Sequence, residues 1–297
     1  MKVIFLYSNR AEYSLLSPYL KYFKKKNQVS EIDLSKKIMK IENDKNLYKI
    51  YELCYNDFKK KKYDFLIILG DRRELPLIAL AAFYLDIKIV HIGAGEFADG
   101  LPAYDQIIRP IISLLSKYQI CFSKDAKTQV DNLFEGISYL KPKSFNVGNA
   151  VFADIDISKF KKPIKEKYDM VLLHPQSLSK KNTEDDVKKL KRILAKNNKK
   201  IVIVKGNKDK NFEIIENFYQ KINKKNILFF ENLPKEKYFS YVKFCDKFYT
   251  NTSSLSEIEF LNKKSLKIIG KRNKNRSRHV MNINAPKKLY TILNNSS

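Results

Sequence analysis

Short apolar runs alternate with longer amphipathic stretches along the chain, a pattern that predicts alternating strands and helices. Residues 65–69 show it most clearly, because five consecutive apolar residues have the length of a parallel strand buried on both faces. The pattern predicts further strands at 2–7, 30–34, 87–90, 119–122 and 144–147, and helices at 11–25, 45–60, 77–85, 105–115 and 125–134. Such an alternation favours a parallel sheet with helices packed on it.

The alternation begins again after residues 151–168, which carry lysines and Pro163 with little periodicity. Strands are predicted at 170–173, 200–204, 227–230, 247–249 and 266–269, and helices at 183–196, 211–222, 235–244, 253–262 and 286–294. We therefore predict an α/β fold of two Rossmann-like β-α-β domains, residues 1–155 and 165–282, facing each other across a cleft. Residues 283–297 form a C-terminal helical segment that can return to the first domain.

The composition is strongly basic, with 58 Lys and Arg against 32 Asp and Glu and a net charge of +26. Such an excess is typical of nucleic-acid-binding proteins. Here, however, lysine runs such as 24–26 and 59–62 are interleaved with Asn and Ile, and no aromatic-basic motif accompanies them. We interpret them as solvated surface lysines and expect no nucleic-acid partner, although the positive field favours phosphorylated ligands.

Several other classes lack their usual sequence signals. The longest apolar run, residues 77–85, is too short to span a bilayer, so no membrane insertion is expected. Residues 1–7 are better explained as a strand than as a signal peptide. Cysteines at 54, 121 and 245 have no metal-ligand spacing and fit a reducing cytoplasm. The chain has no glycine-rich dinucleotide fingerprint and no Gly-Lys-Ser/Thr phosphate loop, so we expect neither a cofactor nor a metal.

Polar and charged residues follow the predicted strands directly. Gly70-Asp71-Arg72 follows strand 65–69, and His91 ends the next strand and opens a loop that reaches Glu96. Open α/β sheets bind their ligands at the carboxyl ends of the strands, so these side chains are expected to converge there. Arg10 lies beside the start of the predicted helix at 11–25, where a guanidinium and free amides suit a phosphate or a sugar carboxamide.

These motifs, in their order along the chain, resemble the hydrolysing UDP-N-acetylglucosamine 2-epimerase family of the sialic-acid pathway. The resemblance extends from residue 3 to residue 276. It rests on Asn9-Arg10-Ala11-Glu12-Tyr13, Gly70-Asp71-Arg72, the loop from His91 to Glu96, Asp105-x-x-x-Arg109, Asn146-Val147-Gly148-Asn149, His174-Pro175, Asn251-Thr252-Ser253-Ser254, and Ile269-Gly270-Lys271-Arg272 with Arg276. It implies the glycosyltransferase-B architecture and a UDP-sugar as the partner, with a homodimer left open.

The family reaction removes the proton at C2 of the sugar while UDP leaves from C1, and water then adds to the resulting glycal. It needs carboxylates that exchange protons and cations that stabilise the departing diphosphate. The resemblance implies that UDP-N-acetylglucosamine or a diacetamido relative is converted into an N-acetylmannosamine-type sugar and UDP. It implies catalytic roles for Asp71, Glu96, Asp105 and His174, and substrate contacts for Arg10, Arg72, His91, Arg109, Thr252, Ser253, Ser254, Glu257, Arg272 and Arg276.

Two positions depart from the family pattern. Gly93 stands where many members carry an acid–base carboxylate two residues after the histidine, so either Glu96 replaces that carboxylate or the proton transfer at C2 is lost. In an ungapped comparison Ile258 stands at the position of the family's ribose-binding glutamate, whereas a shift by one residue would place Glu257 or Glu259 there. The alternative functions are therefore a glycosyltransferase or nucleotide-sugar hydrolase of the same fold, or a silent member that only binds the nucleotide sugar.

Structural roles also stay open for several of these residues. Asp105 is equally well explained as a charge favoured by the dipole at a helix N-terminus. His174 is a lone histidine of a kind that more often packs or forms hydrogen bonds than catalyses. The hydroxyls of residues 252–254 can cap a helix as well as bind a diphosphate.

Overall fold

The chain forms two compact units. The computed structural model describes residues 1–34, 48–97, 103–137, 140, 142–206, 209–222 and 225–295, and for Arg10 and residues 103–105 it describes the backbone only. The described residues of unit 1 are 1–97, 103–155 and 277–295, and those of unit 2 are 156–276. Residues 277–282, placed in the second domain by the sequence pattern, thus lie in unit 1. They do so because an extended segment pairs there, with a bridge between Asn149 and Met281.

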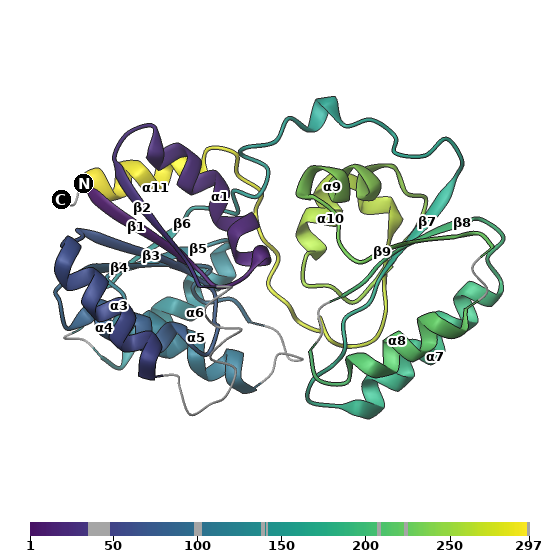
Figure 1. Cartoon of the computed structure of the whole chain (residues 1–297), viewed down its shortest axis with the longest axis horizontal. Coiled ribbons are helices and arrows are strands. Elements are labelled where there is room, and N and C mark those ends of the chain that lie inside the picture. Colours follow the sequence, from purple (N-terminus) through teal and green to yellow (C-terminus); the bar gives the residue numbers. More distant parts are fainter. Residues whose placement is uncertain are drawn as a thin grey trace. The chain divides into compact units, whose positions relative to one another are not determined.

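Unit 1 is built on a six-stranded parallel sheet with the order β2-β1-β3-β4-β5-β6 (Figure 1). The strands are β1 (Lys2–Tyr7), β2 (Gln28–Asp33), β3 (Phe65–Leu69), β4 (Lys88–Ile92), β5 (Tyr118–Cys121) and β6 (Lys143–Asn146). The chain order reverses between β1 and β3. In an open α/β sheet, the crevice at the carboxyl ends of two such strands is the usual place for a ligand.

Helices cover both faces of this sheet. They are α1 (Arg10–Lys24), α3 (Tyr48–Lys61), α4 (Leu75–Phe83), α5 (Ala103–Leu115), α6 (Lys124–Glu135) and α11 (Ala285–Asn294). Successive β1 residues point to opposite faces, so Val3 and Phe5 pack in the core with α1 and α11, whereas Ile4 and Leu6 pack with α3 and α4. Helix α11 lies beside α1 (Figure 1), which brings the C-terminal helix into the core of unit 1.

Unit 2 repeats the arrangement with five parallel strands in the order β11-β10-β7-β8-β9. Its elements are the short 3₁₀ helix η2 (Ile157–Lys159), β7 (Tyr168–Leu172), α7 (Lys180–Ala195), β8 (Lys200–Val204), α8 (Phe212–Lys221), β9 (Ile227–Phe230), α9 (Lys235–Phe244), β10 (Phe248–Thr250), α10 (Leu255–Asn262), η3 (Lys263–Ser265) and β11 (Leu266–Ile268). The chain order reverses between β7 and β10. Two parallel sheets with interleaved helices confirm the predicted fold class of two Rossmann-like α/β domains.

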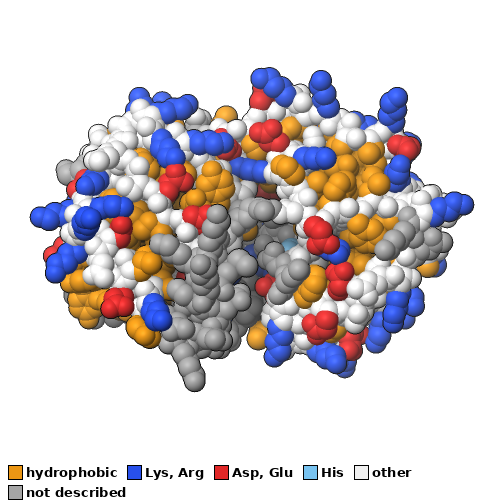
Figure 2. All heavy atoms as spheres, viewed as in Figure 1, with side chains coloured by type: hydrophobic (Ala, Val, Ile, Leu, Met, Phe, Trp, Pro, Cys, Tyr) orange, Lys and Arg blue, Asp and Glu red, His pale blue; other side chains and the backbone are white. Residues whose placement is uncertain are grey.

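The excess positive charge is spread over the surface. On the face shown in Figure 2, lysine and arginine side chains are scattered over both units and interleaved with acidic and apolar ones. Some form exposed ion pairs, such as Lys127 with Asp131 and Lys199 with Asp246. This distribution supports the interpretation of the excess charge as solvated surface lysine. In the described parts of the chain, no helix has the length and apolarity needed to cross a membrane.

Candidate functional site

An arginine joins the loops that follow β3 and β4 in unit 1. Asp71 comes directly after β3, and its Oδ2 accepts a hydrogen bond from Nη2 of Arg109, which lies on α5. Nη1 of Arg109 donates to the carbonyl oxygen of Gly93 at 3.2 Å. The side chains are 12% exposed for Arg109 and 22% for Asp71, so the pair is partly shielded from water and keeps an open side. The two residues, predicted separately from the sequence, thus act as one ion pair at the sheet edge.

Two site residues predicted from the sequence cannot be placed by their side chains. Arg10 begins α1, and Asp105 lies in the first turn of α5. Both side chains lie outside the described residues. The ion pair that the structure describes for Arg109 on α5 is the one with Asp71, in the loop after β3.

The loop after β4 follows a path that only glycine adopts readily. Gly93 has a φ of +75° and Gly95 a φ of +72°, both in the left-handed region. A Cβ atom at Gly95 would also overlap the carbonyl oxygen of Ala126 on α6. The backbone conformation at position 93 therefore favours glycine, which explains why no carboxylate side chain stands there. The turn leads the chain to Glu96.

Glu96 is held by the segment that returns to unit 1 from residue 277 onward. Its Oε2 accepts hydrogen bonds from Oγ of Ser277 and from Nε2 of His279, the latter at 2.8 Å, and its side chain is 7% exposed. Burial alone would raise the pKa of Glu96, but the His279 imidazole, the Ser277 hydroxyl and the positive charge of Arg109 together lower it below its usual value. Glu96 is therefore an ionised carboxylate close to the Asp71–Arg109 pair.

Sequence reasoning missed both partners of Glu96. Ser277 and His279 lie more than 180 positions along the chain from Glu96, just beyond the last family motif at Arg276. The sequence offered one signal for His279: the chain contains only three histidines, so each of them is a candidate for a functional role. His279 also receives a hydrogen bond from Asn149, which belongs to a motif that the sequence singled out without a role.

His91 lies beneath the site. It is fully buried, Nε2 lies 2.8 Å from the carbonyl oxygen of Gly70, and Nδ1 lies 3.0 Å from the hydroxyl of Ser113 on α5. A carbonyl oxygen can only accept, so Nε2 carries the proton and Nδ1 accepts from Ser113. Burial lowers the pKa of His91 to about 4, so the ring is neutral near pH 7. With both nitrogens occupied, His91 positions the turn at Gly70 and has no nitrogen left for a substrate.

A buried glutamate lies at the carboxyl end of β1. Glu12 accepts hydrogen bonds through Oε2 from the backbone N–H of Ser8 at 2.7 Å and from its hydroxyl at 2.9 Å. Burial raises the pKa of Glu12 to about 7. Nε of Arg72 lies 3.1 Å from a carboxylate oxygen of Glu74 and 4.0 Å from one of Glu12. Arg72, predicted as a substrate contact, is 44% exposed and sits between these two carboxylates.

In unit 2, two hydrogen bonds join His174 and Asn251, which follow the neighbouring strands β7 and β10 where the chain order of the sheet reverses. His174 follows β7 and Asn251 follows β10, and these strands are neighbours. The N–H of His174 donates to Oδ1 of Asn251 at 2.7 Å, and Nδ2 of Asn251 donates to the carbonyl oxygen of His174 at 2.8 Å. Burial and then the charge of Arg272 lower the pKa of His174 to about 3, so its ring is neutral near pH 7.

The turn before α10 presents hydroxyls and an amide. Nδ2 of Asn273 donates to the carbonyl oxygens of Asn251 and Thr252, both at 2.8 Å. Because C=O and N–H of a trans peptide point in opposite directions, the N–H of Ser253 is directed away from Asn273. Ser253 is exposed and Ser254 half-buried, whereas Thr252 is buried. The predicted helix at 253 begins at Leu255, so residues 252–254 form the turn that leads into it.

The remaining predicted contacts in unit 2 lie close to this turn. Nη1 of Arg272 donates to the carbonyl oxygen of Asn251 at 3.0 Å, and Nε of Arg276 donates to Oδ1 of Asn273 at 2.9 Å. Glu257 lies in the first turn of α10 and is 4% exposed. Ile258 belongs to the apolar core of unit 2, so it cannot take the place of a ribose-binding residue.

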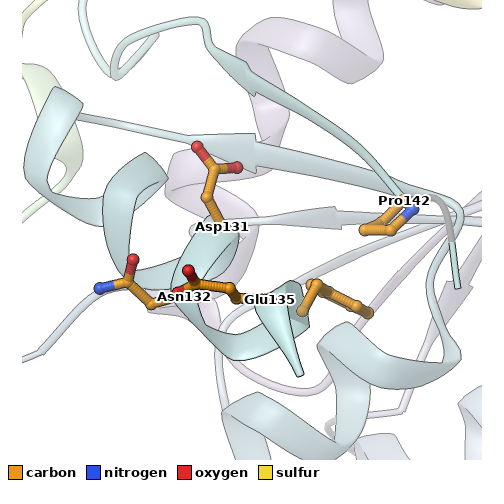
Figure 3. Close-up of a pocket in the computed structure, with 5 residues that line it drawn as sticks. Asp131, Asn132, Glu135 and Pro142 are labelled. Carbon is orange, nitrogen blue, oxygen red and sulfur yellow. The ribbon is translucent and has the colours of Figure 1, made fainter. Parts of the chain in front are cut away.

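A separate pocket of about 430 Å³ lies beside the end of α6 (Figure 3) and is lined by Asp131, Asn132, Phe134, Glu135 and Pro142. Helix α6 starts at the carboxyl end of β5 and ends before β6 begins, so this pocket lies toward the amino ends of the strands. It is therefore remote from Asp71. Among the described residues, no group of three His, Cys, Asp or Glu side chains is arranged to hold a metal ion.

Known proteins resemble this chain over most of its length. The model of the UDP-N-acetylglucosamine 2-epimerase family matches residues 15–296. The chain is 32% identical over 237 residues to the GDP/UDP-N,N'-diacetylbacillosamine 2-epimerase (hydrolyzing) of Campylobacter jejuni, covering 74% of this chain and 60% of that protein. It is 28% identical over 253 residues to the polysialic acid biosynthesis protein P7 of Escherichia coli, covering 79% and 62%. The chain thus spans about 60% of the length of these curated relatives.

Solved structures resemble both units. The Methanocaldococcus jannaschii UDP-GlcNAc 2-epimerase in complex with UDP-GlcNAc and UDP matches with a TM-score of 0.76 and 19% identity, covering 99% of this chain and 100% of that chain. The S. aureus MnaA–UDP co-structure matches with a TM-score of 0.77 and 14% identity, covering 99% and 96%. At such identities the matches show the fold, which is the predicted glycosyltransferase-B-like type.

Proposed function

Because the chain belongs to the UDP-N-acetylglucosamine 2-epimerase family, we propose that it is a hydrolysing UDP-sugar 2-epimerase. It converts UDP-N-acetylglucosamine or a diacetamido relative into a mannosamine-type sugar and UDP. The observation that carries this proposal is the cluster of Asp71, Arg109 and Glu96 at the carboxyl edge of the unit 1 sheet. A cation that pairs with one carboxylate and acts electrostatically on a second suits a reaction in which a proton leaves and returns at a carbon atom.

Glu96 is the base in the proposed first step, and Asp71 exchanges protons beside it. Since the pKa of Glu96 is lowered, its carboxylate is deprotonated near pH 7, which is the form that a base requires. A carboxylate takes the proton from C2, the C–H electron pair forms the C1–C2 double bond, and the C1–O bond breaks so that UDP leaves with its electron pair. Water then adds to the glycal: a proton goes to C2 on the opposite face and a hydroxyl to C1. Arg109 offsets the negative charge of both carboxylates during the exchange.

Unit 2 supplies the groups for UDP. The hydroxyls of Ser253 and Ser254 and the N–H of Ser253 form an anion-binding turn, and Arg272 and Arg276 add positive charge next to it. A bound diphosphate raises the pKa of the neutral His174 ring, and the proton that His174 then takes up offsets the charge of the leaving UDP. Thr252 is buried and holds the turn in shape.

Glu257 is the proposed contact of the ribose hydroxyls. It lies in the first turn of α10, next to the diphosphate-binding residues, whereas Ile258 is committed to the core. The carboxylate can accept two hydrogen bonds from neighbouring hydroxyls.

Two sugars are the candidate substrates. The name of the Campylobacter jejuni relative favours a diacetamido sugar, and the solved structures carry UDP-N-acetylglucosamine and UDP. We also propose a cytoplasmic location, because the thiols of Cys121 and Cys245 are buried and form no disulfide, as expected in a reducing compartment.

A second candidate is a glycosyltransferase or nucleotide-sugar hydrolase that cleaves only the C1–O bond. The observation that favours it is Gly93, whose positive φ leaves no side chain at the family's carboxylate position. The two candidates differ in one bond: the epimerase exchanges hydrogen at C2, and the rival does not.

Incubation with each UDP-sugar in deuterated water separates them, with UDP release and deuterium at C2 followed by NMR. We expect both signals in the wild type. Asp71→Asn and Glu96→Gln should each slow exchange by about 10²–10⁴-fold, the usual loss for a general acid–base group, while UDP binding survives. Asp131→Asn, at the remote pocket, is the matched control and should leave exchange unchanged. UDP release without deuterium at C2 in the wild type would assign the rival function.

A further inference from the structure

Hydrogen bonds connect three side chains in a row: Glu96, His279 and Asn149. The backbone N–H of Val151 donates to Oδ1 of Asn149 at 2.9 Å, which fixes the orientation of the amide. Its Nδ2 therefore faces Nδ1 of His279, at 3.1 Å. An amide nitrogen can only donate, so Nδ1 of His279 accepts and the ring proton sits on Nε2, facing Glu96. The amide thus selects the tautomer of the imidazole.

The return segment carries this imidazole into place through backbone hydrogen bonds. The N–H of Val280 donates to the carbonyl oxygen of Phe122, and the N–H of Asn149 donates to that of Val280, at 2.9 and 2.8 Å. The Phe122 ring packs against the His279 ring with centroids 5.0 Å apart. Neighbouring backbone on both sides therefore restrains the ring.

Both nitrogens of His279 are occupied, so it cannot contact a substrate and must act through Glu96. Oε2 of Glu96 is used by His279 and Ser277. Oε1 is buried, and among the described residues no donor reaches it. An unpaired buried acceptor destabilises the protein, and a proton or a donor from a ligand would remove that penalty. Of the two carboxylate oxygens, Oε2 therefore accepts two hydrogen bonds, and Oε1 accepts none from the described residues.

We propose that His279 and Asn149 are positioning residues that orient Glu96, so that Oε1 is the atom that takes the C2 proton. The inference rests on the proposed function, in which Glu96 is the base. The proton adds to Oε1, while the hydrogen bond from Nε2 to Oε2 persists, so the ring itself neither gains nor loses a proton. The opposite tautomer would turn a nitrogen lone pair toward the carboxylate and repel it.

Variants at His279 separate orientation from simple packing. His279→Gln keeps an N–H donor for Oε2, whereas His279→Leu fills similar space without one. We expect the leucine variant to lose about 10–100-fold in C2 exchange, the size of loss typical when a residue that orients a metal ligand is removed, and the glutamine variant to recover most of that loss. UDP affinity should not change. Val280→Thr, at an exposed neighbouring side chain, is the matched control.

Nitrogen-15 NMR of the full chain without substrate tests the tautomer directly, because only three histidines contribute signals. The His279 ring should carry its proton on Nε2. Asn149→Asp, a near-isosteric change, should instead draw a second proton onto Nδ1, giving an imidazolium signal and slower exchange. This variant also serves if His279→Leu does not fold.

The outcomes distinguish this inference from the function on which it rests. A wild type that exchanges C2 hydrogen but carries the His279 proton on Nδ1 would overturn the inference and leave the function in place. So would a folded leucine variant with wild-type exchange. A wild type without exchange but with an Nε2-protonated ring would overturn the function, while the hydrogen-bonded line of residues would stand.

Discussion

Replacing His91 by glutamine should change how the stability of unit 1 depends on pH. The ring is 0% exposed, bridges the turn at Gly70 and Ser113 on α5, and stays neutral near pH 7. Glutamine can still donate to the Gly70 carbonyl oxygen, but it does not titrate. The difference in stability between the two proteins, followed against pH, therefore reports the lowered pKa of His91 alone.

The size of the effect follows from the pKa difference between the folded and unfolded chain. Burial lowers the pKa of His91 from 6.5 to about 4, so the unfolded chain takes up a proton before the folded protein does. The associated stability is fully present above pH 6.5 and is lost as the pH falls toward 4. The difference between 6.5 and about 4, at about 1.4 kcal/mol per pH unit, is about 3 kcal/mol in all. Between about pH 7.5 and about pH 5 the loss is about 2 kcal/mol.

Glu12 opposes this trend over the same range. Burial raises its pKa from 4.5 to about 7, so the folded protein keeps a proton that the unfolded chain releases. The stability linked to Glu12 is fully present below pH 4.5 and is lost as the pH rises through 7. The pH profile of the wild type alone is therefore uninformative, and only the difference from the variant reports on His91. Glu12→Gln, as a companion variant, should give a difference of the opposite sign.

Urea unfolding at about pH 7.5 and about pH 5 measures these differences. The chain has no tryptophan, so amide hydrogen exchange of peptides from β3 and β4, read by mass spectrometry, follows unit 1 separately from unit 2. The wild type should lose about 2 kcal/mol more than His91→Gln between the two conditions. Equal losses in two folded proteins would refute the argument, because they would mean that His91 titrates normally.

Two further substitutions test the turns of the site. Gly95→Ala should destabilise unit 1 by more than about 1–2 kcal/mol, because its positive φ and the overlap with the Ala126 carbonyl oxygen both oppose a side chain. Gly136→Ala, where nothing lies near the new methyl group, should be neutral or slightly stabilising in the same thermal unfolding experiment. Replacing Ser253 and Ser254 together by alanine should weaken UDP binding by roughly 1–3 kcal/mol in calorimetry, and an unchanged affinity in a folded protein would contradict the proposed diphosphate turn.

Much of the fold was predictable because its elements are local patterns. Five consecutive apolar residues favour a strand that is buried on both faces of a sheet. Strand β3 spans the predicted residues Phe65–Leu69. The predicted bounds of β8 and α9 also match the structure. Boundaries moved where capping decides them: α10 begins at Leu255 because the preceding turn is shaped by hydrogen bonds from Asn273, a residue outside the helix.

The candidate site was predictable only in part, because a strand end does not reveal which way its side chain points. Asp71 and His91 occupy the same kind of position, after β3 and at the end of β4. One keeps an open side, and the other is sealed beneath the sheet edge by Ser113. That choice depends on where α5 packs, which no periodicity near His91 encodes.

The sequence by itself determined that the chain alternates strands and helices, and that polar residues gather at strand ends, since both follow from burial and backbone geometry over a few neighbouring residues. Only the tertiary structure decided the partners of Glu96. Ser277 and His279 reach it because the chain leaves unit 2 and returns beside Asn149, just after β6, and Asn149 sets the proton on the imidazole. Contacts between residues so far apart along the chain depend on the topology of the whole fold, so the pattern of neighbouring residues cannot predict them.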